Sequence, residues 1–548
     1  MGPFDYIVLG GGSAGCAVAG RLSENPGTSV CLVEAGGEGQ DILIRAPMGF
    51  AATAPYGINS WHYQTVPQRG LNGRRGFQPR GKALGGSSAI NAMMYVRGHP
   101  AVFDRWAALG NPGWRYADVL PLFKRSENNE TFTDPAFHGT GGPLNVMHLR
   151  SPSRMNQVFL DACRQSGIPL NPDYNGVRQD GCWNAQVTQK DGERCSAAHA
   201  FIHPNRSRRN LTVLTKAHVN RILFDGNRAI GAQYRQGGEV RHVLANREVV
   251  LSGGAFGSPQ ILMLSGIGPA EHLRRMGIGV LRDVAGVGQN LQDHITSVLT
   301  HRSPGNPDLL GISAAGGLKI ARSIFEWRRQ RTGIITSNAA ESGAFVRSAP
   351  DTDMPDGDMP EGEMPEGEMP DIELEFVVGI VDDHNRKMHL GHGYSLHITL
   401  LQPKSVGEIK LASPDPRTMP LIDPRFLSHP DDIATLVAAT QRALDILAAK
   451  PFDPYRGKML YHYDRNDPAQ IEAMMREQAD TEYHPSGTCK MGPDSDPMAV
   501  VDARLRVKGV SGLRVCDASI MPFITNGNTN APSIMIGEKC ADLLRAEA

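Results

Sequence analysis

A run of glycines near the N-terminus has the spacing of a dinucleotide-binding turn. In GGGSAG, residues 10–15, glycines occupy the first, third and sixth positions, where they permit a tight turn, a close backbone approach to a pyrophosphate and close packing of helix on strand. A helix that begins here would direct free N–H groups and its positive dipole end at the phosphates. Glu34 lies downstream at the end of the next apolar run, where a carboxylate accepts hydrogen bonds from an adenosine ribose. These residues predict a site for an adenine dinucleotide.

The same residues also spell GxSxG, the nucleophile elbow of a serine hydrolase, with Ser13 as the nucleophile. That elbow follows a strand deep inside an α/β sheet, and an upstream loop supplies part of its oxyanion hole. Only twelve residues precede Ser13, which leaves no upstream sheet for such a loop. We therefore expect this turn to bind a dinucleotide rather than to present a nucleophile.

Two further segments combine glycines with polar side chains. PRGKALGGSSAINAMMYVRG, residues 79–98, gathers backbone N–H groups, two serines and Asn91 beside Arg80 and Lys82, which suits an anionic cofactor. GGAFGSPQILMLSGIGP, residues 253–269, places a glycine cluster before an apolar helix. Taken alone, each segment is equally typical of a plain turn.

Apolar runs and periodic segments indicate the elements that position these residues. Residues 6–9 and 29–33 predict strands on either side of a helix over 13–22. Amphipathic helices are expected at 155–165, 432–448, 470–478 and 534–545, and strands rich in β-branched residues at 211–214, 248–252, 372–378 and 395–401. The mixture predicts an α/β or α+β architecture.

Length and composition favour a large globular protein of two or more domains, or of one large unit with a covering domain. The chain has 548 residues, of which 40% are hydrophobic and 21% are charged, too apolar for a disordered chain. Eight cysteines lie far apart without a CxxC pair, which favours reduced thiols and a cytoplasmic protein. We expect no secretory leader, and no stretch approaches the ~20 apolar residues of a membrane-spanning helix. Membrane contact should then be peripheral.

The near-zero net charge conceals an acidic insertion. Against 57 Asp and Glu stand 56 Lys and Arg, a formal net charge of −1. Residues 351–371 hold nine of the acids and no Lys or Arg, so 48 acids and 56 bases remain elsewhere, a net charge of +8. Proline and glycine in the MPxGx repeat of 354–370 oppose helix and strand, so we expect a solvated, inert loop. A loose cation site or a partner-binding tail is the alternative, and no nucleic-acid partner is expected.

Segments throughout the chain resemble the signatures of the glucose–methanol–choline (GMC) oxidoreductases, which are FAD-dependent alcohol-oxidising flavoenzymes. Residues 79–98 and 253–269 resemble the two family signatures, and YHPSGTCKMG, residues 483–492, resembles the catalytic His-Pro segment. LRVCDASIMP, residues 513–522, is similar to the strand exit that contacts the pyrophosphate, and NGNTNAPSIMIGEK, residues 526–539, to the second catalytic position before the last helix. The resemblance covers essentially the whole chain and is closest in the bacterial alcohol and choline dehydrogenase branch.

The resemblance implies a bipartite GMC fold. A Rossmann-like FAD-binding domain would be assembled from the separate segments 1–40, 79–150, 212–300 and 484–548. A sheet-and-helix substrate-binding domain, which covers the reacting face of the flavin, would comprise 41–78, 151–211 and 301–483, with the acidic insertion at 351–371.

The resemblance also implies a catalytic pair. His484 matches the family base, since a neutral histidine with an unperturbed pKa near ~6.5 suits removal of a hydroxyl proton. Asn528 matches the second position, which hydrogen-bonds the alcohol oxygen. The alternatives are a structural turn for His484 and a helix-capping Asx turn for Asn528. His294 is expected to be structural, and no group of residues has metal-ligand spacing.

The implied cofactor is FAD, bound near the start of the last helix around Pro532, whose positive end would stabilise reduced flavin. Ile90 stands where some relatives carry the histidine that attaches FAD covalently, so noncovalent binding is expected. The residues expected to bind the cofactor are Gly10, Gly12, Ser13, Ala14, Gly15, Glu34, Ala35, Arg80, Gly85, Gly86, Ser87, Asn91, Ala92, Met93, Val219, Asp517, Ala518, Asn528, Thr529 and Asn530.

The expected reaction is oxidation of a primary alcohol to an aldehyde, with proton removal by His484, hydride transfer to flavin N5 and a quinone or another non-oxygen acceptor. An oxidase that returns electrons to O2 and acts on aryl or furan alcohols is one alternative. Choline dehydrogenase is another, for which Trp61, Tyr63, Tyr95 and Tyr463 could supply an aromatic cage. A non-redox lyase on the same scaffold is a remote one. Association with the inner membrane and a homo-oligomer are left open.

Overall fold

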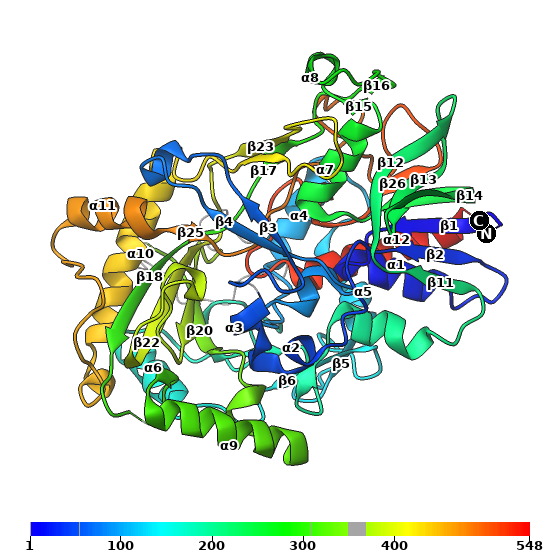
Figure 1. Cartoon of the computed structure of the whole chain (residues 1–548). Coiled ribbons are helices and arrows are strands. Elements are labelled where there is room, and N and C mark those ends of the chain that lie inside the picture. The colour runs from blue at the N-terminus through cyan, green and yellow to red at the C-terminus, as the bar shows by residue number, and fades with distance from the viewer. Residues whose placement is uncertain (1, 54, 307, 349–368, 548) are drawn as a thin grey trace.

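The structure is a computed structural model that describes residues 2–53, 55–306, 308–348 and 369–547. Nearly all of the acidic insertion, including 354–368 of its repeat, lies outside the described residues, and the inert loop stays a prediction. Figure 1 shows two sheets on opposite sides of the molecule, with both termini beside the first. Within the described ranges, no helix is long and apolar enough to cross a bilayer.

The first sheet is built mainly from buried parallel strands. Its order is β11–β2–β1–β14–β13–β12, and β26 pairs with β14. The strands are β1 (Phe4–Leu9), β2 (Val30–Val33), β11 (Leu211–Leu214), β12 (Ala217–Asp225), β13 (Arg228–Gln236), β14 (Glu239–Leu251) and β26 (Leu513–Val515). The apolar runs of β1 and β2 are continuous because both faces of these parallel strands are buried. Helix α1 (Ser13–Leu22) follows β1 and packs on α12 (Asn530–Ala546), so the predicted strand, turn, helix and strand are confirmed.

The second sheet is antiparallel, with the order β25–β18–β22–β21–β20–β7. Its strands are β7 (Gly181–Asn184), β18 (Ile295–Arg302), β20 (Ala340–Val346), β21 (Ile372–Val377), β22 (Gly391–Leu400) and β25 (Asp480–Thr481). Helices α6 (Met155–Gln165), α10 (Pro430–Ala448) and α11 (Pro468–Gln478) contact it. Leu374 and Phe376 of β21 join the same core cluster as these helices. Glu373 and Glu375 alternate with them, so they lie on the opposite face.

The predicted helices and strands are confirmed within a few residues, with two differences. β14 begins at Glu239 because a polar hairpin with β13 extends it beyond the apolar part at 248–251. α12 begins at Asn530, so Pro532 lies inside its first turn rather than at its first position. This position costs little, because the first N–H groups of a helix have no intrahelical partner.

The division into discontinuous domains stays a proposal. The strands refine one boundary of it, because β18 pairs in the second sheet although a boundary at residue 300 assigns most of β18 to the FAD-binding segment. We propose that this boundary falls before Ile295. The eight cysteines are all free and buried.

Candidate active site

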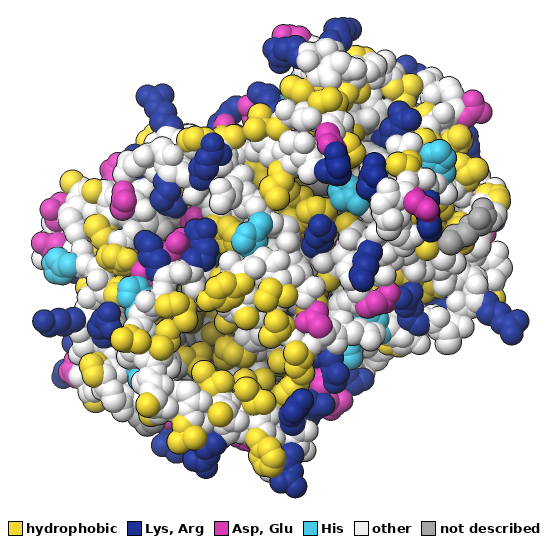
Figure 2. Space-filling model, in the orientation of Figure 1, with side chains coloured by type: hydrophobic (Ala, Val, Ile, Leu, Met, Phe, Trp, Pro, Cys, Tyr) yellow, Lys and Arg dark blue, Asp and Glu magenta, His cyan; other side chains and the backbone are white. Residues whose placement is uncertain are grey.

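A single large pocket contains most of the residues expected to function. It lies outside the carboxyl ends of β1 and β2, where ligands bind in open parallel sheets, and it reaches the second sheet at Glu375. The expected residues that line it are Gly10, Gly12, Ser13, Ala14, Glu34, Ala35, Arg80, Gly86, Ser87, Asn91, Ala92, Met93, Val219, His484, Asp517, Ala518, Asn528, Thr529 and Asn530. On the face shown in Figure 2, hydrophobic side chains gather around a hollow in the region of α3 (Phe50–Thr53) and β20.

Gly15 and Gly85 were expected to bind the cofactor but do not line the pocket. A Cβ atom on Gly15 would lie 2.0 Å from the Gly10 carbonyl oxygen, so this glycine permits helix α1 to pack against the turn. Gly85 has a φ of +99°, which an L side chain rarely adopts, and turns the chain toward Gly86. Both glycines shape the loops around the pocket, and their contact with the cofactor stays a prediction.

Three helix N-termini meet at this pocket, and none is capped by the side chain of its own N-cap residue. They belong to α1, α7 (Gly254–Leu264) and α12, and their N-cap residues Gly12, Gly253 and Thr529 all line the pocket. The first N–H groups of each helix lack intrahelical partners and carry a partial positive charge. A Cβ atom on Gly12 would meet nothing within 4 Å, so the turn is open on that side. This arrangement fits the pyrophosphate of a dinucleotide.

Two buried carboxylates hold the loops that form this cradle. Glu34 accepts hydrogen bonds from the backbone N–H of Gly11 at 2.9 Å and of Gly36 at 2.7 Å, and burial raises its pKa to about 7. Asp517 accepts from the Gly254 N–H at 2.9 Å and from the Ser258 hydroxyl at 2.6 Å. Each carboxylate retains lone pairs that can accept hydroxyl groups of a bound nucleotide.

The expected catalytic pair meets at the other end of the pocket. His484 Nε2 lies 3.2 Å from Asn528 Nδ2, and His484 Nδ1 lies 3.0 Å from Nδ1 of His294. His294 Nε2 lies 3.1 Å from the Leu401 carbonyl oxygen, which can only accept, so Nε2 of His294 must donate. The His294 Nδ1 atom is then an acceptor for the His484 Nδ1–H. In this order His484 Nε2 is unprotonated, and its lone pair accepts a hydrogen bond from Asn528 Nδ2 at the wall of the pocket.

Burial keeps both imidazoles neutral. It lowers the pKa of His294 to about 4 and holds the pKa of His484 well below its ordinary value, with added repulsion from His294 and Arg80. His294 was expected to be merely structural. Its contact with His484 agrees with that expectation and gives it a specific form, because the acceptor on His294 fixes the tautomer of the His484 imidazole.

The backbone of His484 is fixed by a buried carboxylate. Asp293 accepts from the His484 N–H at 2.9 Å, from the Thr481 hydroxyl at 2.6 Å and from Gln78 Nε2 at 3.1 Å. Burial raises the pKa of Asp293 to about 6. Tyr483 has a φ of +70°, a conformation uncommon for a residue with a side chain. These contacts hold the turn that presents the imidazole.

Asn528 depends on the glycine before it. Gly527 has a φ of +123°, and a Cβ atom there would lie 2.5 Å from Val96 Cγ1. The Asn528 Nδ2 group lies 3.2 Å from His484 Nε2 and 3.5 Å from Glu375 Oε1. Its Oδ1 atom is buried and has no hydrogen-bond partner within the described part of the chain. A buried polar atom without a partner, next to His484, fits a hydrogen bond to a bound substrate.

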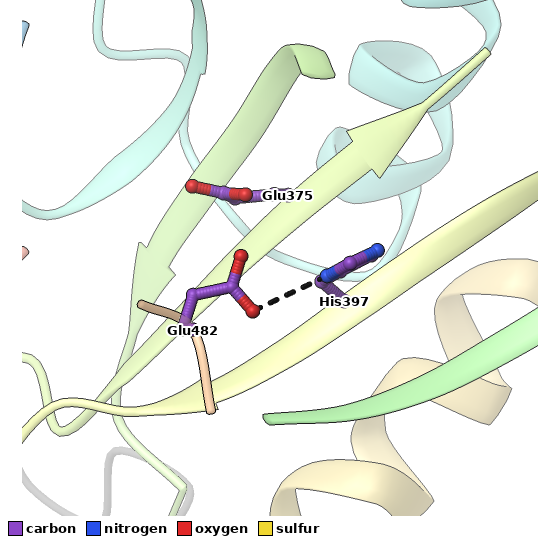
Figure 3. Close-up of side chains that lie close together, drawn as sticks. All are labelled: Glu375, His397 and Glu482. Atoms are coloured by element: carbon purple, nitrogen blue, oxygen red, sulfur yellow. Dashed lines mark hydrogen bonds and ion pairs between the residues drawn. The ribbon is translucent and has the colours of Figure 1, made fainter. Parts of the chain in front are cut away.

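A group of three ionisable residues beside this pair was absent from the sequence-based expectations. Glu375, His397 and Glu482 offer ligand atoms that all lie within 4.8 Å of one another, although no metal-ligand spacing marks them in the sequence. Figure 3 shows Glu375 and Glu482 on one side of His397, with the ion pair between Glu482 and His397 at 3.3 Å. Burial and the charge of Glu482 raise the pKa of Glu375 to about 8. For His397, burial favours the neutral form, but Glu482 and Glu375 raise the pKa above its ordinary value.

The aromatic residues considered for a choline cage do not surround the catalytic pair. Trp61 and Tyr63 line the pocket, but Trp61 packs 5.7 Å from the ring of His218 and beneath Lys82 Nζ, at the cofactor end near Val219. Tyr95 and Tyr463 are buried outside the pocket lining.

Comparison with known proteins agrees with this geometry. The family model described as GMC oxidoreductase matches residues 4–296 in its N-terminal part and residues 403–537 in its C-terminal part. An alcohol dehydrogenase [acceptor] of Pseudomonas putida is 41% identical, covering 99% of this chain and 95% of that relative. Human mitochondrial choline dehydrogenase is 40% identical, covering 99% of this chain and 90% of the relative.

Solved structures give the same result. Pyridoxine 4-oxidase from Mesorbium loti has a TM-score of 0.86 at 31% identity and covers 99% of both chains. A formate oxidase from Aspergillus oryzae has a TM-score of 0.89 at 28% identity, covering 99% of this chain and 98% of that one. The protein is thus an oxidoreductase with a mixed α/β, dinucleotide-binding fold. It belongs to the GMC oxidoreductase family, whose members are FAD flavoproteins.

Proposed function

We propose that this protein oxidises primary alcohols to aldehydes, with FAD bound noncovalently and a quinone or another non-oxygen compound as the final acceptor. The observation that carries the proposal is the arrangement at His484, whose unprotonated Nε2 faces the pocket beside Asn528 at 3.2 Å. The N-termini of α1 and α12 provide the anionic cofactor with backbone donors in the same pocket, whereas the first N–H of α7 is bound by Asp517.

The residues divide the reaction between proton removal and orientation. An alcohol hydroxyl that contacts both side chains and takes the place of the Asn528 amide at His484 Nε2 donates its proton to that nitrogen, while an Asn528 amide hydrogen stabilises the negative charge that develops on oxygen. FAD, when bound, supplies the acceptor for the carbinol hydride. His294 keeps the proton of neutral His484 on Nδ1 and so keeps Nε2 available. The products are an aldehyde, one proton on His484 and a two-electron reduced cofactor.

Noncovalent attachment is supported by Ile90, which lines the pocket in the segment where some relatives use histidine. An aliphatic side chain cannot form the bond to the flavin ring. Acid precipitation tests this proposal, because noncovalent FAD would leave a yellow supernatant and a colourless pellet. A yellow pellet would refute it.

Anaerobic mixing with alcohols tests the reaction itself. Bleaching of the flavin by a primary alcohol, with formation of the aldehyde and loss of bleaching in His484→Ala, is the expected result. Asn528→Ala should slow bleaching but retain the base. Unchanged bleaching in His484→Ala would refute the assignment of the base.

The acceptor is decided by exposing the reduced protein to air. Rapid reoxidation of the flavin by O2, with formation of hydrogen peroxide, would favour an oxidase. Pyridoxine 4-oxidase and formate oxidase represent this alternative among the structural relatives. Slow reoxidation in air and rapid reoxidation by a soluble quinone would support the dehydrogenase.

For the location, we propose peripheral contact with an anionic membrane through α9 (Ala314–Gln330). The outward side of this helix exposes Leu318 to 63% and Phe325 to 60%, which lie seven residues apart on one face. The helix contains four basic residues and a single acid, Glu326. Figure 2 shows hydrophobic and basic side chains side by side along the lower edge, where Figure 1 places α9. Apolar residues flanked by basic ones are typical of helices that lie in the membrane interface.

Sedimentation with lipid vesicles tests this contact. The wild-type protein should pellet with vesicles rich in phosphatidylglycerol and less with pure phosphatidylcholine. The double variant Leu318→Glu and Phe325→Glu should stay in solution with unchanged flavin bleaching. Equal sedimentation of variant and wild type would rule out α9 as the contact.

A further inference from the structure

Several acidic side chains of the second sheet and of the segment beside it lie together at the end of the pocket that contains His484. Glu373 and Glu375 lie on the same face of β21, since residues two apart along a strand share a face. Glu375 pairs across the sheet with His397 of β22, and Glu482 lies beside both. The three carboxyl groups are almost fully enclosed, with Glu373 at 0%, Glu375 at 5% and Glu482 at 6% exposure.

These carboxyl groups have fewer partners than buried acids normally have. Both oxygens of Glu373 lack a hydrogen-bond partner in the part of the chain that the structure describes. Glu375 has one long contact with an amide, 3.5 Å from Asn528 Nδ2, and lies against the carboxyl group of Glu482, which also pairs with His397. Buried carboxylates without donors are costly, and mutual repulsion together with burial raises the pKa of Glu373. A bound cation that carries N–H donors would satisfy both the charge and the hydrogen bonds.

We propose that Glu375 and Glu482, with Glu373 behind them, form an ammonium-binding subsite, and that the substrate is an amino alcohol with a protonated primary or secondary amine. The inference rests on the proposed alcohol oxidation and narrows its substrate class. Glu375 and Glu482 both line the pocket that contains His484, so a ligand can reach the two carboxylates and the base at once.

The geometry sets the length of such a substrate. Asn528 Nδ2 lies 3.2 Å from His484 Nε2 and 3.5 Å from Glu375 Oε1. The Asn528 amide thus contacts both His484 and Glu375, so a hydroxyl group held by His484 and Asn528 is separated from the Glu375 carboxylate by this amide alone. An amine joined to the carbinol carbon by a short carbon chain can reach Glu375 while the hydroxyl stays at the base.

The acceptors favour an amine with N–H groups over other cations. A quaternary ammonium offers no N–H donor and is usually held by aromatic faces, whereas Trp61 lies at the cofactor end of the pocket. A divalent metal would require neutral His397 as a ligand, but this imidazole is already paired with Glu482 at 3.3 Å. Carboxylates that open onto the substrate space suit a cation that arrives and leaves with the substrate.

Matched substrates test the selectivity. Aminopropanol, with the two functional groups at opposite ends, has the same chain length as butanol, and choline supplies a quaternary ammonium. The wild-type protein should reduce its flavin with a kcat/KM at least about tenfold higher for aminopropanol than for butanol, as one charge-assisted hydrogen bond predicts. This ratio should fall toward one in Glu375→Gln and in Glu482→Gln. Glu341→Gln, a control at a buried acid of β20 outside the pocket lining, should keep the ratio.

Binding of an unreactive amine separates this inference from the proposed function. Titration of propylamine into the FAD-loaded protein should give saturable heat and a shift in the flavin absorption, and both should be lost in Glu375→Gln. Tetramethylammonium should bind at least about tenfold more weakly. Bleaching by butanol without preference for aminopropanol, together with no propylamine binding, would overturn the subsite and leave alcohol oxidation intact. Propylamine binding without bleaching by any alcohol would support the subsite and contradict the proposed reaction.

Two further results decide between the cations. A stoichiometric divalent metal in the purified wild-type protein, absent from Glu375→Gln, would overturn the ammonium assignment in favour of a metal site. If Glu375→Gln does not fold, Glu482→Gln and the comparison of propylamine with tetramethylammonium on wild-type protein carry the test. Equal affinity for propylamine and tetramethylammonium would overturn the proposal.

Discussion

Replacing His294 with phenylalanine isolates the effect of one buried hydrogen bond on the proposed base. The ring volume is largely retained, but the acceptor at 3.0 Å from His484 Nδ1 is lost. The Nδ1–H of His484 then has no partner in an enclosed site, because His294 is 0% exposed and His484 is 7% exposed. The proton can move to Nε2, which removes the lone pair that faces the substrate.

The magnitude follows from the cost of a buried donor without a partner, about 1–3 kcal/mol. Each ~1.4 kcal/mol in the barrier changes a rate tenfold. We therefore expect the rate of flavin reduction at saturating alcohol to fall about tenfold to a hundredfold. The effect should appear mainly in the rate of reduction rather than in alcohol affinity, because His294 does not line the pocket.

Stopped-flow bleaching of the flavin under anaerobic conditions measures this rate. His294→Asn is the matched control, since its Oδ1 atom can accept the same proton and should recover much of the rate. The FAD content of each variant, read from the ratio of visible to ultraviolet absorbance, excludes loss of cofactor. A His294→Phe protein with full FAD and the wild-type reduction rate would refute the positioning role.

Four more predictions concern the cofactor, the stability and the pH dependence. Gly12→Val places methyl groups on the open side of the cradle and should reduce FAD content at least about tenfold. Visible absorbance would measure the FAD content, and circular dichroism would show that the protein is folded. Full FAD occupancy would contradict the pyrophosphate site. Arg97 and Glu127 form a buried ion pair at 2.5 Å, so Arg97→Met should lower the free energy of unfolding by about 3–5 kcal/mol in urea titrations. Burial opposes ionisation of Glu127, but Arg97 and His138 lower its pKa. The ionised carboxylate therefore stabilises the fold above the unfolded pKa near ~4.3, and this stabilisation is lost as the pH falls through the folded pKa. Glu127→Gln should flatten the decline of stability at acid pH, and an unaltered decline would be contrary evidence. Because burial lowers the pKa of His484, its neutral form persists below the ordinary value, and flavin reduction should show no protonation step near pH ~6.5, whereas a tenfold loss per pH unit there would contradict a neutral, buried base.

The elements that could be predicted are those whose periodicity carries the information. The continuous apolar run of β1, the glycine turn and the small residues of α1 predict the dinucleotide half of the fold, because buried parallel strands and close helix packing restrict the residue types. The helix α9 was not predicted, since its most exposed positions include Leu318 and Phe325. An outward apolar stripe interrupts the ordinary pattern of an amphipathic helix, whose polar side faces water.

The candidate site could be predicted where it consists of contiguous motifs. His484 and Asn528 belong to such segments, and both line the pocket beside each other. His294 could not be assigned, because its role depends on a tautomer fixed by the Leu401 carbonyl oxygen. Only the fold brings that carbonyl oxygen and His484 to the two nitrogen atoms of one imidazole.

The acids of β21 show why alternation alone does not identify a binding site. In IELEFV, residues 372–377, apolar and acidic residues alternate, a pattern typical of a strand with one face in the core and the other in water. The apolar face does pack against the helices of the second sheet. The acidic face instead borders the pocket at Glu375 and contacts Glu482 and Asn528, which come from distant segments. The sequence determines which side of the strand is polar, whereas only the packing of the two halves determines whether that side meets solvent or substrate. If the ammonium subsite is correct, the residues that select the substrate are those whose local pattern is typical of an exposed strand face.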